Sequence, residues 1–106
     1  MAKGNVIWTK TAAKQRRAIL RYWTLKNKSS SYAEKLIVLI NNQLKIIAKF
    51  PKIYVQSDFP NIRVSAMGNF SLYYKINEET IEVVAFWDNR QDPKKLIQIL
   101  GKNDSG

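Results

Sequence analysis

Apolar residues follow two different spacings along the chain, which divide it into a helical first half and a strand-rich second half. From residue 33 to residue 48 they recur every three or four positions and form one broad apolar face. This spacing predicts an amphipathic helix. Ser31 and Glu34 form a capping-box pattern at its start, and Pro51 is expected to end the helix near Phe50.

A sparser helical pattern precedes it, from about Lys10 to Lys26. Its few apolar residues predict a surface helix with one narrow buried stripe, and Thr9 is suited to cap its first turn. Only about four loop residues separate the two helices. We therefore expect the helices to pack as an antiparallel hairpin.

The rest of the chain carries strand patterns, marked by β-branched runs or by alternation of apolar and polar residues. The strands are expected at residues 5–9, 62–66, 70–76 and 80–87. The segment 52–61 lies between two prolines and is expected to be irregular. Pro93 suits the first turn of a last helix, which should end near Leu100 and leave residues 101–106 as a polar, flexible tail.

These elements follow one another in the order β-α-α-β-β-β-α, which predicts an α+β fold in a single domain over residues 1–106. We expect the helical hairpin to pack on a mainly antiparallel four-stranded sheet, beside a short C-terminal helix. The strand at residues 80–87 is apolar on both faces and should be the most covered.

The turn between the second and third strands decides which side chains share a face. A three-residue turn over residues 67–69 would pair Ala66 with Phe70. The alternating apolar residues of both strands would then face the core together. The polar residues would share the opposite face, namely Arg63, Ser65, Ser71, Tyr73 and Lys75.

The net charge of the chain is +10, and no acidic residue precedes Glu34. Three arginines and five lysines fall in that first part, among them Arg16, Arg17 and Arg21. The bias indicates an anionic partner, which on charge alone is RNA, DNA, an acidic protein segment or anionic lipid. No apolar run resembles a signal peptide or a membrane span, so we expect a cytoplasmic protein without membrane attachment.

The chain contains neither cysteine nor histidine, which excludes disulfides, thiolate metal sites, cysteine nucleophiles and histidine general bases. Acid–base chemistry would fall to tyrosine, lysine, arginine or a carboxylate. Asp88 and Asp92 lie four positions apart around a turn, where a turn-capping role is expected rather than metal binding. We expect no metal and no cofactor.

A cluster of candidate residues for binding or catalysis is expected on the sheet face away from the core. Arg63, Tyr73 and Lys75 would meet Arg90 there and could bind phosphates or stabilise a phosphoryl transition state. Arg90 could equally pair with a neighbouring aspartate. The remaining candidate contact residues are Trp87, at the end of the apolar strand, with Lys94 and Lys95 after it.

Several short segments occur in a fixed order between residues 6 and 100. They are Ile7-Trp8-Thr9 followed by Ala12 and Ala13, Tyr22-Trp23, Ala33, Phe50-Pro51, Ile62-Arg63-Val64, Leu72-Tyr73-Tyr74-Lys75-Ile76 and Asn89-Arg90-Gln91-Asp92-Pro93. Together with the element order, this set resembles the RelE/ParE superfamily of toxins from type II toxin–antitoxin modules. The resemblance implies a small basic toxin, neutralised by a cognate antitoxin that wraps it with an acidic or amphipathic, partly disordered segment. The assembly would be a homodimer or a toxin–antitoxin hetero-oligomer.

The resemblance leaves two activities open. RelE-like members cut mRNA on the ribosome with basic residues and a tyrosine or histidine, whereas ParE-like members inhibit DNA gyrase without a catalytic set. Of the residues that such a nuclease implies, the arginine after the last strand is present as Arg90. At the other positions Ser71 replaces an arginine, Leu96 a tyrosine, and Ile62 and Val64 a pair of lysines, unless a one-residue gap brings Arg63 there.

These substitutions favour a ParE-like toxin that inhibits DNA gyrase and leave it uncertain whether the chain is an enzyme. The alternative is a ribosome-dependent mRNA endonuclease with an atypical site, in which Arg63, Tyr73 and Arg90 would be catalytic. A further alternative is a basic nucleic-acid-binding domain without toxicity.

Overall fold

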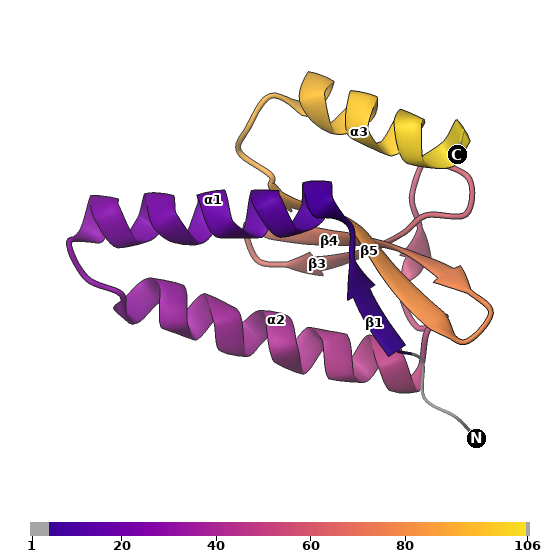
Figure 1. Cartoon of the computed structure of the whole chain (residues 1–106), viewed down its shortest axis with the longest axis horizontal. Coiled ribbons are helices and arrows are strands. Elements are labelled where there is room, and N and C mark those ends of the chain that lie inside the picture. The colour runs from indigo at the N-terminus through magenta and orange to yellow at the C-terminus, as the bar shows by residue number, and fades with distance from the viewer. Residues whose placement is uncertain (1–4, 106) are drawn as a thin grey trace.

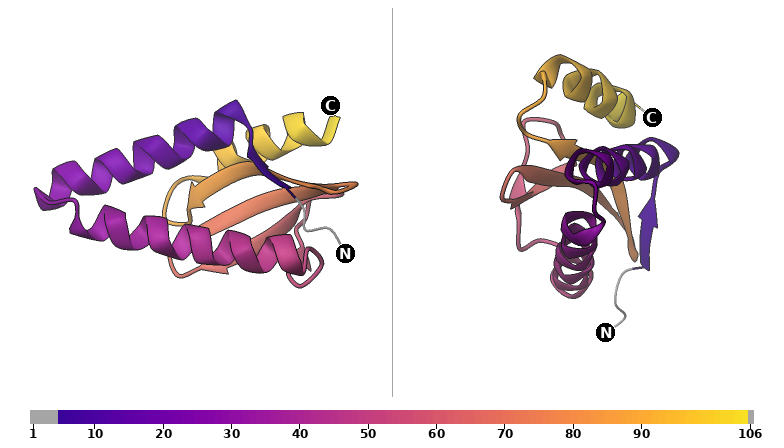
Figure 2. Two further views of the ribbon diagram at one scale, coloured as in Figure 1. Left: turned by 60° about the horizontal axis from the view of Figure 1, so that its bottom comes forward. Right: turned by 90° about the vertical axis from the view of Figure 1, so that its left-hand side faces the viewer.

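The computed structural model describes residues 5–105, and its first half is a strand that leads into a helical hairpin (Figure 1). Strand β1 (Asn5–Trp8) is followed by helix α1 (Lys10–Asn27) and helix α2 (Ser31–Lys49). Thr9 caps α1 as expected, because its hydroxyl oxygen accepts a hydrogen bond from the Ala12 amide at 3.1 Å. The loop end of the hairpin projects beyond the sheet (Figures 1 and 2).

The predicted capping box of α2 is wrong. Ser31 is the first helical residue, and the residue before it, Ser30, has helical backbone angles and no side-chain capping bond. The Ser30 hydroxyl donates to the Glu34 carboxylate at 2.7 Å instead. The helix therefore starts one residue earlier than the pattern required, and Glu34 is bound by a hydroxyl group rather than by a backbone amide.

Strand β1 and the four strands of the second half form a five-stranded sheet in the order β1-β5-β4-β3-β2. Those four strands are β2 (Val55–Gln56), β3 (Arg63–Met67), β4 (Phe70–Asn77) and β5 (Thr80–Asp88). Strand β1 runs parallel to β5, and the other pairs are antiparallel. The α+β class is confirmed, but the expected count of four strands is wrong, because the segment 52–61 contributes the short edge strand β2.

The turn between β3 and β4 has two residues rather than three. Met67 pairs with Phe70, and Gly68 has a φ of 64°, a conformation that glycine adopts without strain. This shift by one residue turns every β3 side chain to the face opposite to the predicted one. Arg63 and Ser65 consequently share the hairpin-facing side with Leu72, and Ile62 is buried on the other side.

Strand β5 is the most covered strand, as predicted, and it separates two cores. The larger core lies between the sheet and the helical hairpin and includes Ile81, Val83 and Phe86. An irregularity in the β4–β5 pairing leaves Val84 without a β4 partner. Val84 and Ala85 therefore both face the second core, under helix α3.

Helix α3 (Pro93–Ser105) covers the sheet face opposite to the hairpin (Figure 2). The Asp92 carboxylate caps it by accepting from the Lys94 amide at 3.0 Å, which confirms the capping role predicted for this aspartate. The predicted end near Leu100 is wrong, because the helix continues through polar residues. Trp87 packs under α3 and is only 6% exposed, so its predicted place on a contact surface is wrong as well.

No helix in the described part of the chain is long and apolar enough to cross a membrane.

Candidate functional site

The predicted cluster of Arg63, Tyr73 and Lys75 on one sheet face does not form, because the β3 register turns Arg63 to the other side. Arg63 is half-buried, and its Nη1 donates to the Tyr54 carbonyl at 2.7 Å. Arg63 and Lys75 still line one cavity of about 280 Å³, at the end of β3 and β4 that lies away from the turn connecting them. The guanidinium of Arg63 is therefore partly engaged in holding the β2 segment to the sheet.

Tyr73 lies on the face covered by α3, half-buried beside the second core. Burial, with a smaller contribution from the negative charge of Asp58, raises the pKa of its phenol above the ordinary value. The hydroxyl therefore stays protonated near neutral pH. It can donate a hydrogen bond but is poorly suited to act as a general base.

Arg90 follows β5 at the opposite end of the sheet and forms a two-pronged ion pair with Asp88. Its Nε donates to Asp88 Oδ1 at 2.9 Å and its Nη2 to Oδ2 at 2.8 Å, and the Arg90 amide also donates to Oδ1. The Asp88 side chain is 10% exposed and that of Arg90 48% exposed. Hydrogen bonds from Arg90 lower the pKa of Asp88, so the carboxylate is charged and fixes the plane of the guanidinium.

Aromatic rings surround the exposed side of this arginine. The Arg90 guanidinium carbon lies 5.1 Å from the centre of the Trp23 ring and 5.7 Å from that of Phe70, and Lys26 Nζ lies 5.2 Å from Trp23. Trp23 also contacts the ring of Tyr32, with centres 5.1 Å apart. These distances suit cation–π interactions that hold both cations beside the loop end of the hairpin.

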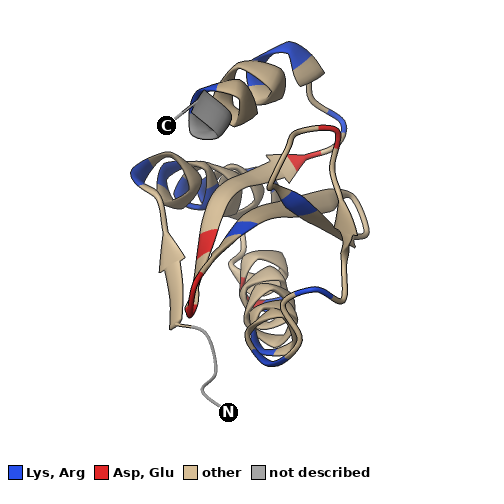
Figure 3. Ribbon diagram, turned by 90° about the vertical axis from the view of Figure 1, so that its right-hand side faces the viewer, with Lys and Arg blue, Asp and Glu red and all other residues tan. Residues whose placement is uncertain are grey.

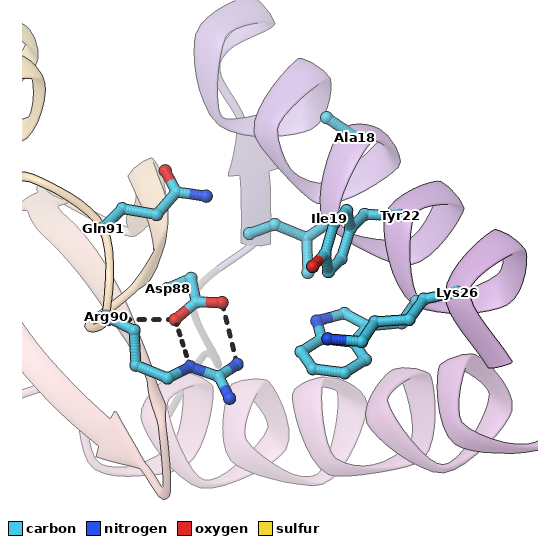
Figure 4. A pocket seen from close by; sticks show the side chains of 8 residues that line it. Ala18, Ile19, Tyr22, Lys26, Asp88, Arg90 and Gln91 are labelled. Atoms are coloured by element: carbon cyan, nitrogen blue, oxygen red, sulfur yellow. Dashed lines mark hydrogen bonds and ion pairs between the residues drawn. The ribbon is translucent and has the colours of Figure 1, made fainter.

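A cavity of about 580 Å³ lies between α1 and the end of β5 (Figure 4). It is lined by Ala18, Ile19, Tyr22, Trp23, Lys26, Asp88, Arg90 and Gln91. The buried Trp23 Nε1 has no hydrogen-bond partner among the described residues. Two cations and several rings around one cavity suit contact with a partner side chain that is acidic or aromatic. Sequence reasoning missed Tyr22, Trp23 and Lys26 as residues of this site, because the contact between α1 and Arg90 is visible only in the fold.

Arg63 and Arg90 lie at opposite ends of the sheet. Phe70 pairs with both Met67 and Asp88, so these three residues mark the Arg90 end. Arg63 precedes Met67 by four positions in the same strand, which corresponds to about 13 Å along the sheet. The two arginines, which a nuclease would use together, therefore do not share a site.

The positions at which a nuclease would carry further polar side chains serve the fold instead. The Ser71 hydroxyl is buried and donates to Asn89 Oδ1 at 3.0 Å. Leu96 and Ile62 are buried in the core under α3, and Val64 is half-buried.

The remaining candidate cations lie on the helices that surround the sheet (Figure 3). Helix α1 contains no acidic residue, and its Arg17 and Arg21 are exposed, whereas Arg16 is half-buried with its guanidinium 4.2 Å from the Trp8 ring centre. Lys94 and Lys95 are exposed at the start of α3. The basic residues therefore form a broad surface rather than one focused site. Within the part of the chain that the structure describes, no group of three or more acidic side chains is placed to hold a metal ion.

Comparison with solved structures shows where this architecture recurs. The fold is similar to that of a chain titled "Chromosomal ParDE TA system from P. aeruginosa", with a TM-score of 0.67 and 19% sequence identity over 79% of this chain and 94% of that chain. The two chains thus share the fold of a helical hairpin packed on a mixed sheet. The chain belongs to the ParE toxin family, because the model described as "ParE toxin of type II toxin-antitoxin system, parDE" matches residues 6–93. No curated protein sequence matches the chain.

Proposed function

We propose that the chain is a toxin that inhibits DNA gyrase by binding it and that a cognate antitoxin keeps it inactive. The observation that carries the proposal is the dispersal of the candidate nuclease residues. Arg63 lies at one end of the sheet, Arg90 lies at the other, and Tyr73 is held under α3. Metal-free cleavage of RNA would need such groups around one phosphate.

The Arg90 cavity supports a binding role. Asp88 holds the guanidinium in one orientation, and Trp23 and Phe70 border it. Rigid arginine and aromatic side chains around a cavity are typical of the centre of a protein interface. The charge of +10 favours an acidic partner, both for the antitoxin and for the contacted segment of gyrase, and the site of action would be the cytoplasm.

Induction of the toxin in a bacterial host, with and without the antitoxin gene from the same operon, tests this proposal. We expect plasmid DNA to lose negative supercoils after induction and to keep them when the antitoxin is present. Primer extension on mRNA from the same cells provides the second measurement. New cleavage ends within translated mRNA, together with unchanged plasmid topology, would refute the gyrase proposal and support a nuclease.

A further inference from the structure

Within the broad basic surface, helix α1 carries one regular row of exposed cations, spaced by four, three and four residues. The row consists of Lys10, Lys14, Arg17 and Arg21. Because successive helical residues point about 100° apart, the four side chains leave the helix within a sector of about 60°. The buried residues of α1, Ala12 and Ile19, lie on the opposite side of the helix. This α1 basic row therefore points away from the core, and it spans about 16 Å at 1.5 Å per residue.

The fold leaves the side chains of this row without partners. Among the described residues, none of the four forms an ion pair, a side-chain hydrogen bond or a ring contact. The other two cations of α1 do have partners. The Arg16 guanidinium lies 4.2 Å from the centre of the Trp8 ring, and Lys26 Nζ lies 5.2 Å from that of Trp23. The row thus contains the cations of α1 that remain available to an external ligand, and α1 has no acidic residue to neutralise them.

The row also works against the helix that carries it. Lys10 is the first residue of α1, where the helix dipole favours a negative charge rather than a positive one. The other cations of the row follow at intervals of three or four residues, a spacing at which like charges repel and destabilise a helix. An anion bound along the row would relieve both effects. The pattern is therefore unfavourable for the free chain and favourable for a chain with an anionic partner.

Phosphate groups suit the row better than an acidic protein segment does. The centre of a protein interface is apolar and depleted in lysine, whereas phosphate contacts are made largely by lysine and arginine. On α1, exposed large apolar side chains occur only beyond Arg21, at Tyr22 and Leu25. Ala13 and Ala18 border the middle of the row and are small enough for a nucleic-acid backbone to approach the helix. The chemistry of the row therefore favours a nucleic acid.

A duplex suits the row better than a single strand does. Proteins that bind single strands usually add aromatic side chains on which the bases stack, and the row contains no aromatic residue. A helix holds its cations along a straight line, and duplex DNA presents a rigid line of charge, with one phosphate per about 1.7 Å of its axis. A single strand would first have to be straightened to follow such a row.

We propose that the α1 basic row binds the phosphate backbone of duplex DNA without reading its sequence. Each of the four cations neutralises one phosphate, and no base is contacted. This DNA binding goes beyond the proposed function and needs neither gyrase nor an antitoxin. Its consequence for a gyrase inhibitor would be to hold the chain on the DNA on which its target acts.

The salt dependence of binding counts the phosphate contacts. The purified full-length chain, with its fold checked by circular dichroism, would be titrated into a short fluorescent DNA duplex, and binding would be followed by anisotropy. Four contacts predict a slope of about −3.6 for the logarithm of the affinity against the logarithm of the salt concentration. The affinity should therefore fall about 150-fold between roughly 50 and 200 mM salt. A second duplex of unrelated sequence should bind equally well.

Two double variants of equal charge locate the contacts. Lys14→Gln combined with Arg17→Gln removes two cations from the row and should reduce the slope to about −1.8. Lys94→Gln combined with Lys95→Gln removes the same charge from the start of α3, on the sheet face opposite to the hairpin (Figure 2), and should leave the slope near that of the wild type. Glutamine has nearly the helix propensity of lysine and arginine, so both variants are expected to fold.

Three results would overturn the proposal. The wild-type chain could fail to bind the duplex at low salt, or the two double variants could show the same slope. A single strand of the same length could bind at least as tightly as the duplex. Poly-glutamate, bound through the row by a chain that ignores DNA, would replace the DNA with an acidic protein segment. Since these titrations contain neither gyrase nor antitoxin, their outcome is independent of whether the chain inhibits gyrase.

Discussion

Gln15 should hold helix α1 to strand β5 through one partly buried hydrogen bond. Strand β1 ends at Trp8, opposite Val83, so the β5 edge beyond that point has lost its parallel neighbour. Beyond that point the side chain of Gln15 supplies an acceptor to the β5 edge. Its Oε1 accepts a hydrogen bond from the amide of Phe86 at 2.8 Å, and Phe86 is fully buried. Replacement of Gln15 by leucine keeps a similar helix propensity but removes the acceptor.

The expected loss of stability comes from the Phe86 amide, which remains buried without its acceptor. A buried amide without an acceptor costs about 1–3 kcal/mol, so Gln15→Leu should lower the free energy of unfolding by that amount. For a chain of this size each kcal/mol corresponds to roughly 4–8 °C in Tm. Urea denaturation followed by tryptophan fluorescence would measure the loss, with an unchanged m-value showing that the two-state comparison holds.

Gln98→Leu, at an exposed position of α3, is the matched control and should change the free energy of unfolding by less than about 0.5 kcal/mol. Amide hydrogen exchange gives a local readout, since Phe86 should lose protection more than its neighbours in β5. If Gln15→Leu were as stable as the control and Phe86 stayed protected, the hydrogen bond would not support the α1–β5 contact.

Three further predictions address other parts of the molecule. Tyr73→Phe should leave growth inhibition unchanged, because Tyr73 packs beside the core under α3 and does not line the cavity beside Arg90; a folded variant without toxicity in a growth assay would instead indicate a functional role for the hydroxyl. Leu100→Ala should cost about 2–5 kcal/mol in urea denaturation, since Leu100 is buried between α3 and β5, whereas exposed Ile97→Ala should change little, and equal effects would contradict this packing. The pKa of Asp88 lies below its ordinary 3.8 in the folded chain, so its contribution to stability is present above that pH and is lost as the pH falls through the lower folded value. Asp88→Asn should therefore flatten the fall of the urea midpoint below pH 3.8, and an unchanged acid slope would be evidence against the Arg90 pairing.

The sequence predicted the elements of this fold well because each carries a strong local signal. The three-to-four-residue repeat of α2, the Thr9 cap and the double-sided apolar pattern of β5 all appear in the structure. Once the elements were located, their order along the chain was known as well. The short strand β2 was missed because two residues offer no periodicity, and its formation depends on pairing with β3.

The arrangement of the site was harder to predict, because it depends on register and on contacts between distant segments. The alternation of β3 is compatible with either set of its side chains facing the helical hairpin. The two-residue turn at Gly68 fixes the register that turns Ser65 toward the hairpin. Ser65 is buried there, and its hydroxyl accepts a hydrogen bond from Gln43 of α2. Trp87 looked like a rim residue because polar residues follow it, yet α3 folds back over it. The candidate residues were predicted to lie on an uncovered sheet face, whereas the molecule buries side chains on both faces of the sheet.

The contacts of Arg90 were also only partly predictable from the sequence. Its ion pair with Asp88 is local and was one of the alternatives that the sequence left open. Its contact with Trp23 joins α1 to the end of β5, and no spacing in the sequence encodes that approach. Residues that a nuclease resemblance would group together, such as Arg63 and Arg90, are separated by the sheet itself.

The most direct test of a binding toxin is a titration of purified gyrase with the purified, antitoxin-free chain in a supercoiling assay. A toxin that acts by binding should block supercoiling in proportion to the toxin added and reach full inhibition once the gyrase is saturated, and added antitoxin should restore activity. Gyrase that stayed fully active at a large molar excess of folded toxin would contradict a toxin that acts by binding.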